Sequence, residues 1–518
     1  MKMDLKTEVL IIGGGATGAG IARDLALRGI PSLLVEKGDF TCGASGRNQG
    51  LLHSGARYAV YDPEAARECI AENRILRTIV PHCIEHTEGL FVSLPEDGVE
   101  YRADFIRACE NAGIETLPLS PQEALRLEPR LNPRIIGAVQ VPDGAVDPFT
   151  LVVENIRDAE ARGTRVFTHT EVVGLIREGG GITGAHLKDL INGERFAVGA
   201  SWIVNATGAW ANSILKMAGI RIPMTLSKGS MLITNTRLSQ RVLNRCRPPA
   251  SGDIIVPNGT VSIIGTTSLR VEDIEDNDVK PEEVALLVDE ISRMVPQIRQ
   301  ERFTRAYAGV RPLIRAGETD DDRSISRGFS LIDHNKEHGL SGLLTIAGGK
   351  LITYRLMAEK TVDFICERMG LHVACTTHVQ RLPGAGIGRS LQDRLLNMGR
   401  HISSVHQEII CDCEMVPRDE VEAVLKEGKV RTLQDILHRT RIAKGTCQGG
   451  FCVYRLLGMF NELRRKEGSG DSNEILRGFL EERWKGIQPV LWGVSLKEEE
   501  LIESIYKGLF NLSGEQND

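Results

Sequence analysis

A short glycine-rich turn near the N-terminus constrains this chain more than any other feature. Residues 8–12 form an apolar run typical of a buried strand, and a G-x-G-x-x-G pattern follows at once. Its three glycines are Gly13, Gly15 and Gly18. We expect a helix over 16–29 and a second strand over 31–35, which ends at Glu36. In such a βαβ unit the glycines allow a tight turn, close approach of a pyrophosphate and close helix–strand packing, while the acidic residue can bind a ribose. The unit therefore predicts a dinucleotide-binding domain of Rossmann-like α/β fold.

Two more glycine turns follow strands later in the chain, at 205–210 and 347–351. An N-terminal dinucleotide motif suits NAD as well as FAD. A flavin bound in an extended pose needs backbone contact from several segments far apart in sequence, and these turns can supply it. Each turn taken alone could also be an ordinary connection between a strand and a helix. The combination of three turns favours FAD.

The size and charge of the chain narrow its functional class. A chain of 518 residues is expected to form two or three domains. Its net charge of −6 argues against nucleic-acid binding, which requires a basic face, and against broad adhesion to anionic lipid. The first residues lead into a strand rather than a signal peptide, and no apolar run is long enough for a membrane span. We therefore expect a cytoplasmic protein, or one held at the inner face of the cell membrane through other proteins of a complex.

Cysteine is distributed unevenly along the chain. Seven of the eleven cysteines are scattered through 42–375, and four lie within 411–452. These four are Cys411, Cys413, Cys447 and Cys452. In a reducing compartment such a group suggests a 2Fe–2S cluster or a structural zinc, and the remaining alternative is unligated thiols. The tight C-x-C pair and the glycine-rich second loop favour 2Fe–2S. The other seven lack partners at ligand spacing and are expected to be buried small side chains.

Several motifs of this chain together resemble the flavin-dependent glycerol-3-phosphate dehydrogenases. They are GGGATGAGIARDLALRG, TCGASGRNQGLLHSGARY, NATGAW, GVRPLIR and GGKLITYR. The resemblance implies a discontinuous FAD-binding domain of the glutathione-reductase and amino-acid-oxidase type, with a mainly antiparallel substrate domain. The cysteine segment resembles bacterioferritin-associated ferredoxin domains, which bind 2Fe–2S. The combination resembles the FAD-binding, substrate-oxidising subunit of the anaerobic members of the family.

This resemblance carries a detailed functional expectation. It implies oxidation of sn-glycerol 3-phosphate to dihydroxyacetone phosphate by hydride transfer to FAD, with electrons passing through an iron–sulfur site towards a quinone-linked respiratory chain in anaerobic glycerol metabolism. It also implies two partners, a second flavoprotein and a membrane-attached iron–sulfur protein, with FMN as an option in the complex. The expected domains are an oxidoreductase over 1–385, a ferredoxin-like domain over 405–460 and a helical tail over 474–518.

The resemblance also assigns candidate site residues. Besides the three motif glycines and Glu36, the cofactor-binding candidates are Lys37, Ser45, Thr207, Gly208, Gly348, Gly349 and Leu351. The substrate-binding candidates are Arg57, Tyr58, Arg311, Arg327 and Lys350. A dianionic phosphate needs several cations, and the planar guanidinium of Arg matches its oxygens, although an arbitrary Arg is usually a solvated surface charge. Aerobic relatives carry a His after Lys-Gly-Ser where this chain has Met231, so that contact is lost or replaced here.

The flavin would take the hydride, and the protein would orient the substrate and accept its hydroxyl proton. His53 is a candidate base because an ordinary histidine has a pKa of about 6.5. It could equally be a structural histidine, and Lys350 could polarise the hydroxyl instead; Arg311 completes the catalytic candidates. Two other functions compete: an amine or amino-acid oxidase, and a non-catalytic electron-transfer flavoprotein. An oxidase would need one Arg to bind a carboxylate, and an electron-transfer flavoprotein would need no cations on the substrate side. The several candidate substrate-binding cations disfavour both functions.

The C-terminal residues carry an apolar stripe at helical spacing. It consists of Leu501, Ile502, Ile505, Tyr506, Leu509 and Phe510. We expect this stripe either to pack on its own domain or to dock to a partner protein of the complex. Three glutamates precede it and few cations flank it, which argues against insertion into a membrane.

Overall fold

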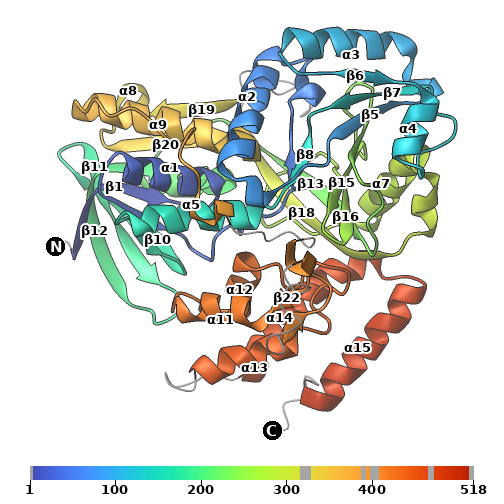
Figure 1. Cartoon of the computed structure of the whole chain (residues 1–518). Helices are drawn as coiled ribbons and strands as arrows, with labels where there is room; N and C mark the ends of the chain where they lie inside the picture. Colours follow the sequence, from blue (N-terminus) through green and yellow to red (C-terminus); the bar gives the residue numbers. More distant parts are fainter. Residues whose placement is uncertain are drawn as a thin grey trace.

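The chain forms a mixed sheet, a mainly antiparallel sheet and a group of C-terminal helices (Figure 1). This computed structural model describes residues 4–314, 328–386, 393–396, 408–464, 472–510 and 512. The two sheets lie side by side, and the C-terminal helices lie beneath both in the view of Figure 1. The α/β fold class expected from the glycine turn, with a mainly antiparallel second domain and a helical C-terminal domain, is confirmed.

The mixed sheet brings the three glycine turns to one edge. β1 (Leu5–Ile12) pairs in parallel with β2 (Ser32–Val35) and β12 (Arg195–Asn205), and α1 (Ala16–Leu27) connects β1 to β2. β12 also pairs in parallel with β20 (Leu343–Gly348). Because β1, β12 and β20 run in the same direction, the turns that follow them meet at the carboxyl edge, where α/β sheets bind ligands. The other strands of this sheet are β9 (Arg165–Phe167), β10 (Thr170–Glu178), β11 (Gly181–Asp189) and β19 (Phe329–Asp333).

Both faces of the mixed sheet are buried, which explains the continuous apolar run of β1. Successive side chains of a strand point to opposite faces. Val9 and Ile11 therefore enter the core that contains α1, whereas Leu10 and Ile12 enter a second core on the other face. The first core contains α1, α5 (Pro148–Ala161), α9 (Tyr354–Met369) and part of α2 (Pro63–Ile79), and the second contains α6 (Ala211–Met217).

The second sheet is organised on β13 (Met224–Thr234), which pairs antiparallel with β18 (Phe303–Ile314) along its whole length. Among its described strands, only β5 (Gly89–Ser93) and β14 (Val242–Arg245) pair in parallel. These strands also include β5 (Gly89–Ser93), β6 (Leu117–Leu119), β7 (Gly137–Val141), β14 (Val242–Arg245), β15 (Ile254–Asn258), β16 (Val261–Gly265) and β17 (Leu269–Val271). α7 (Pro281–Met294) covers this sheet, as its apolar stripe predicts. Smaller elements are β3 (Leu51–Leu52), β4 (Ile84–Glu85), β8 (Gly144–Val146), α2 (Pro63–Ile79), α3 (Val99–Asn111), α4 (Pro121–Leu127) and α8 (His334–His338).

The C-terminal helices share one core with the cysteine segment. Leu476 and Phe479, in the tail that the sequence sets apart, pack with Cys411 and Cys452 in this core. The apolar stripe on α15 (Val494–Phe510) divides into two parts. Ile502 and Tyr506 are buried on their own domain, whereas Leu501, Ile505 and Leu509 are exposed. The elements are β21 (Ile409–Cys411), β22 (Val416–Pro417), α11 (Arg418–Lys426), α12 (Leu433–Arg439), α13 (Val453–Arg464), α14 (Ser472–Ile487) and α15 (Val494–Phe510). None of the described helices combines the length and apolar composition that crossing a membrane requires.

Candidate active site and cysteine centre

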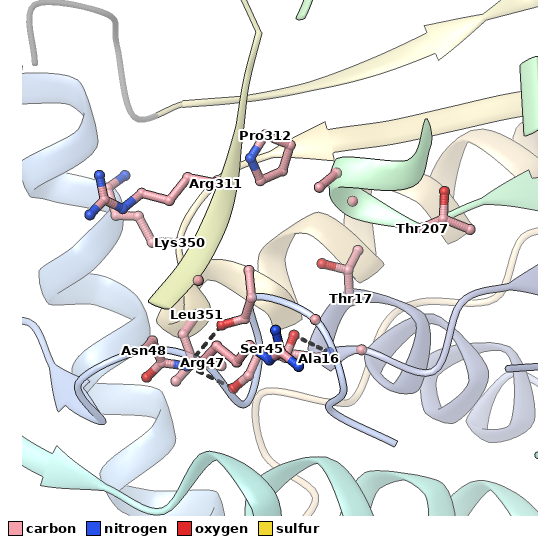
Figure 2. Close-up of a pocket in the computed structure, with 18 of the residues that line it drawn as sticks. Ala16, Thr17, Ser45, Arg47, Asn48, Thr207, Arg311, Pro312, Lys350 and Leu351 are labelled. Carbon is pink, nitrogen blue, oxygen red and sulfur yellow. Dashed lines mark hydrogen bonds between the residues drawn. The ribbon is translucent and has the colours of Figure 1, made fainter. Parts of the chain in front are cut away.

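One cavity of about 1220 Å³ touches all three glycine turns and most of the candidate substrate residues. Its volume exceeds the roughly 300–1,000 Å³ of a typical small-molecule site, as a site for a dinucleotide and a substrate would require. In Figure 2 the side chains of Arg311 and Lys350 extend to one side of the cavity, away from Thr17 and Thr207. The cavity therefore has a glycine end and a cationic end.

The glycine end depends on the absence of side chains. Gly13 has a φ of 114°, and a Cβ on it would lie 2.7 Å from the carbonyl oxygen of Ala206. A Cβ on Gly15 would meet only Ser45, at 3.0 Å, so Gly15 borders open cavity. Gly18 does not border the cavity; a Cβ there would lie 1.9 Å from the carbonyl oxygen of Gly13. The third glycine thus lets α1 approach β1 and presents the helix N-terminus, with its amide groups and positive dipole end, to the cavity.

Polar side chains fix this end from a neighbouring segment. The Ser45 hydroxyl accepts a hydrogen bond from the Ala16 amide at 2.9 Å, which caps the first turn of α1 (Figure 2). The Glu36 carboxylate accepts hydrogen bonds from the amides of Gly14 (2.6 Å) and Gly38 (2.9 Å), and burial raises its pKa. Lys37 is exposed, lines the cavity and forms an ion pair with Glu171. Glu36 therefore braces the turn from within the chain, in addition to the ribose contact expected of it.

The second and third glycine turns also border the cavity. Thr207, Gly208, Gly348, Gly349 and Leu351 all line it. The glycines of these turns adopt the geometry of tight turns: φ is 58° at Gly208, 87° at Gly348 and 75° at Gly349, values that L-residues rarely adopt. A Cβ at Gly348 would lie 2.8 Å from the carbonyl oxygen of Gly328. These turns therefore bring main chain from distant segments to one space, as an extended FAD requires.

At the cationic end, Arg311 is held in a fixed orientation. One terminal nitrogen donates to the Thr266 hydroxyl at 2.8 Å and to the Thr267 carbonyl at 2.9 Å, and the other lies 3.4 Å from the hydroxyls of Ser227 and Ser268. These four partners are neutral groups, and Arg311 lines the cavity, where its guanidinium can meet an anion. Neither the threonines nor the serines were identified from the sequence, because strand pairing brings them to Arg311 from other strands and loops.

Four further candidates line the same cavity as Arg311: Arg57, Tyr58, Lys350 and His53. Arg57 lines the cavity and forms an ion pair of 2.9 Å with Asp253, which is wholly buried and also binds Arg247. The Lys350 ammonium lies 5.1 Å from the centre of the Tyr58 ring, and the centre of the His53 ring lies 5.4 Å from the centre of the same Tyr58 ring. Both groups line the same cavity. Arg327 lies outside the described residues.

Among the other cysteines, one departs from expectation. Cys69, Cys83, Cys109, Cys246 and Cys366 are buried, as expected of small apolar side chains. Cys42 is exposed and lines the cavity, so the prediction of a buried side chain is wrong there. Cys42 lies in the segment that follows β2, and Ser45 and Arg47 of the same segment also line the cavity. Cys375 is intermediate in exposure.

The four C-terminal cysteines come together from two loops. Their thiols hydrogen-bond in the pairs Cys411–Cys452, Cys413–Cys447 and Cys447–Cys452, and these bonds lower the pKa of Cys447 and Cys411 and raise the pKa of Cys413 and Cys452. Across the described residues, no three or more Cys, His, Asp or Glu side chains form a group that could hold a metal ion. A 2Fe–2S cluster is ligated by four thiolates shared between two irons, for which paired sulfurs are a suitable donor set.

Backbone amides surround these sulfurs. Cys447 accepts from the amides of Gly449 and Phe451, and Cys411 accepts from those of Ala443 and Glu414. The second cysteine loop turns tightly around the Cys447 sulfur because Gln448 and Gly449 both have positive φ, at 48° and 87°. Amide hydrogen bonds to sulfur are among the features that set the potential of iron–sulfur clusters. The sulfur pairs and the amides around them therefore suit a 2Fe–2S cluster, although the side chains are not already arranged around one point as a metal site among the described residues.

Comparisons with known proteins agree with this geometry. Residues 8–355 match the family model "FAD dependent oxidoreductase", and residues 409–462 match a BFD-like 2Fe-2S binding domain. Among curated relatives, one of the subunits of the anaerobic glycerol-3-phosphate dehydrogenase of Escherichia coli K12 is 46% identical, with 99% of this chain and 98% of that protein covered. The protein of the same name from Haemophilus influenzae is 43% identical, with 98% of this chain and 94% of that protein covered.

Solved structures agree on the fold. The glycerol-3-phosphate dehydrogenase from Bacillus halodurans complexed with FAD has a TM-score of 0.66 at 22% identity, and covers 95% of this chain and 97% of its own. The FAD-bound L-alpha-glycerophosphate oxidase from Mycoplasma pneumoniae has a TM-score of 0.58 at 19% identity, with 74% of this chain covered and 100% of that one. This chain therefore belongs to the FAD-dependent oxidoreductases and, among them, to the family of anaerobic glycerol-3-phosphate dehydrogenase subunits that these curated relatives represent.

Proposed function

We propose that the protein oxidises sn-glycerol 3-phosphate to dihydroxyacetone phosphate with FAD as the hydride acceptor. The observation that carries this proposal is the single cavity that joins the glycine turn at α1 to the cations Arg57, Arg311 and Lys350. A dinucleotide turn alone would suit many substrates, whereas a cluster of cations at the other end suits a small phosphorylated alcohol. The near full-length relatives carry the name of this activity.

The side chains at the cationic end divide the work of binding and proton handling. Arg311 and Arg57 bind the phosphate, Arg311 with its orientation set by Thr266 and Thr267 and Arg57 with its orientation set by Asp253. Arg327 is proposed as a further phosphate ligand from its motif. Lys350 and His53, which both lie next to the Tyr58 ring, are the candidates for receiving or stabilising the hydroxyl proton. Bound FAD supplies the two-electron acceptor, and the three glycine turns with Glu36, Lys37 and Ser45 hold it.

Anaerobic flavin bleaching tests this proposal. Purified protein with bound FAD should lose its flavin absorbance on addition of glycerol 3-phosphate, and glycerol at the same concentration should bleach it far more slowly. A pH profile of bleaching in His53→Asn and Lys350→Met separates the two proton candidates, because loss of the true base removes the acid limb of the profile. Bleaching by an amino acid rather than by glycerol 3-phosphate would contradict the proposal.

For the cysteine centre, we propose one 2Fe–2S cluster bound by Cys411, Cys413, Cys447 and Cys452. Support comes from the sulfur pairs, the amides around them and the matching domain. Anaerobic purification followed by metal and sulfide analysis should give about two irons and two sulfides per chain, with a paramagnetic signal after one-electron reduction. Stoichiometric zinc without iron would overturn the cluster and leave the FAD site standing.

The partners and physiological route extend the same proposal. The relatives are named as one subunit of a larger enzyme, which supports the presence of further subunits. We propose a second flavoprotein subunit, in which FMN can reside, together with a membrane-attached iron–sulfur subunit that delivers electrons to quinone during anaerobic growth and holds this protein at the inner face of the membrane. The exposed row Leu501, Ile505 and Leu509 offers a contact surface. Quinone reduction that requires the other subunits would support this, and quinone reduction by this chain alone would contradict it.

A further inference from the structure

A buried ionic group joins the cysteine domain to the wall of the cavity. Its centre is Arg441, which follows α12 and precedes the second cysteine loop. Arg441 Nε donates to Glu414 Oε2 at 2.6 Å, Nη1 to Asp147 Oδ2 at 3.1 Å and Nη2 to Asn258 Oδ1 at 2.8 Å. The side chains of Arg441, Glu414 and Asp147 are only 13%, 0% and 11% exposed. Each partner belongs to a different part of the molecule: the first cysteine loop, the start of α5 and the end of β15.

One side of this group reaches the cysteine centre. Glu414 is the next residue after Cys413, and its other oxygen accepts a hydrogen bond from Thr260 of the antiparallel sheet. A Cβ placed on Gly445 would lie 2.5 Å from the Cβ of Cys413, so the two cysteine loops touch at this point. The first cysteine loop is therefore bonded through Glu414 both to Arg441 and to the oxidoreductase domain.

The other side of the group reaches the cavity wall. The Val146 amide, next to Asp147, donates to the Gly50 carbonyl at 2.7 Å. A Cβ placed on Gly50 would lie 3.4 Å from the side-chain nitrogen of Asn258. Gly50 follows Asn48 and Gln49, which line the cavity. A continuous chain of contacts thus runs from the cavity wall through Asn258 and Arg441 to Glu414 and Cys413.

A second buried contact fixes the same orientation. Asp39, which is 2% exposed, binds both Arg439 (2.7 Å) and His438 (2.9 Å) of α12. Buried charges are tolerated only when their partners are in place, and such groups are best known for fixing registry. Two of them across one interface therefore favour a single docked position of the cysteine domain over a mobile one.

We infer that Arg441 is a positioning residue for electron transfer: it holds the Cys413 loop against the cavity wall, so that electrons pass from the flavin to the cysteine centre within this chain and without domain movement. This inference rests on the proposed function for the identity of both redox groups. Substrate oxidation delivers two electrons to FAD, and the hydroxyl proton goes to the protein. A 2Fe–2S cluster takes one electron at a time, so complete reoxidation of the flavin during turnover needs an external one-electron acceptor such as ferricyanide. The single-turnover test omits that acceptor and follows only the first electron transfer from the flavin to the cluster.

The test resolves the two electron transfers in anaerobic stopped flow. Substrate should bleach the flavin of Arg441→Ala at a rate close to that of the unaltered protein. Freeze-quench detection of the reduced cluster should show that its reduction is slower by about tenfold or more, as expected when a reacting pair is displaced. Iron content and both reduction potentials should be unchanged, which would exclude lost cluster or lost driving force as the cause.

A readout that needs neither cofactor nor turnover tests the docking itself. Hydrogen exchange over residues 409–417 should be faster in cluster-free Arg441→Ala than in cluster-free unaltered protein. Arg418→Ala is the matched control, because Arg418 lies on α11 of the same domain with exposed partners, Glu408 and Glu422. It should leave both exchange and electron transfer unaltered.

Asn258→Ala provides a second test of the same contact. If Arg441→Ala loses iron or fails to fold, Asn258→Ala removes one of the three bonds and should slow cluster reduction to a smaller extent. In a parallel experiment, light rather than substrate reduces the flavin. If glycerol 3-phosphate does not reduce the flavin but light-reduced flavin still reduces the cluster, the proposed function is wrong and the inference about Arg441 stands. Cluster reduction at the unaltered rate in both Arg441→Ala and Asn258→Ala would overturn it, as would an unaltered protein whose reduced flavin never reduces the cluster.

Discussion

The two ends of the cavity are built in different ways. At the glycine end, main chain from three parallel strands makes the walls, and the critical feature is the absence of side chains at Gly13 and Gly15. At the cationic end, long side chains make the walls, and each is held by a partner from elsewhere: Arg311 by Thr266, and Arg57 by Asp253. The glycine end is therefore rigid because of the fold, whereas the cationic end is rigid because of individual hydrogen bonds.

This difference predicts two kinds of failure. A side chain added at the glycine end collides with backbone or cofactor, so it should affect folding or flavin content before catalysis. A side chain removed at the cationic end leaves the main chain in place, so it should affect kcat/KM while the flavin stays bound. If a substitution at the cationic end caused loss of flavin, or one at the glycine end lowered kcat/KM with flavin still bound, the two ends would not be independent.

The largest effect is expected at Gly18. In Gly18→Ala the new Cβ would lie 1.9 Å from the Gly13 carbonyl, so α1 must move from β1, at a cost to the free energy of unfolding of about 3 kcal/mol or more. Gly15→Ala is the matched variant, since its Cβ meets only the Ser45 hydroxyl at 3.0 Å. We expect it to keep the apo-protein melting temperature and to lose flavin, measured as flavin absorbance per chain. Equal melting temperatures and full flavin in both variants would contradict the account of this turn.

The next effect concerns Arg311. Arg311→Ala should remove a charge-assisted phosphate contact of about 1.5–3 kcal/mol, which corresponds to a loss of roughly 10- to 150-fold in kcat/KM with unchanged flavin content. Activity with glycerol, which has no phosphate, should fall much less. Arg107→Ala, at an exposed ion pair with Asp104, serves as control. An equal loss for glycerol and glycerol 3-phosphate would mean that Arg311 does not bind phosphate.

The same contrast explains what the sequence could predict. The βαβ unit is contiguous, so Gly13, Gly15 and Gly18 indicate both the fold and the cofactor end within one short segment. Arg311 and Lys350 could be assigned only because their motifs resemble those of a family. Asp253 and Arg441 were not identified at all, since their roles arise when strands and domains pair and no local pattern marks them. Positions that act through distant partners need the tertiary structure.

Asp253 tests whether the cationic end depends on such partners. In Asp253→Asn, Arg57 and Arg247 lose the charge that orients them, although an acceptor of similar shape remains. We expect a rise in KM for glycerol 3-phosphate of roughly fivefold, equivalent to about 1 kcal/mol, with kcat changed less. Asp104→Asn, at the exposed pair with Arg107, should leave KM unchanged. A fall in kcat with constant KM would assign Asp253 to the chemical step rather than to positioning.

The smallest effect lies away from both ends, where the mixed sheet contacts the cysteine domain through His169 and Asp435. Burial lowers the pKa of His169, but the hydrogen bond and charge of Asp435 raise it by more, so the net pKa is above its usual value. A histidine whose pKa is raised on folding stabilises the protein below its unfolded pKa of about 6.5, and this stabilisation disappears as the pH rises through the folded pKa. The difference in unfolding free energy between the unaltered protein and His169→Gln should therefore shrink by up to about 1 kcal/mol from pH 5.5 to pH 8.5 in urea titrations. His372→Gln, at an exposed position, is the matched control variant. His169 and Asp435 are not among the residues that line the cavity, so flavin content and kcat/KM should stay constant in His169→Gln. A change in either would connect this domain contact to the active site.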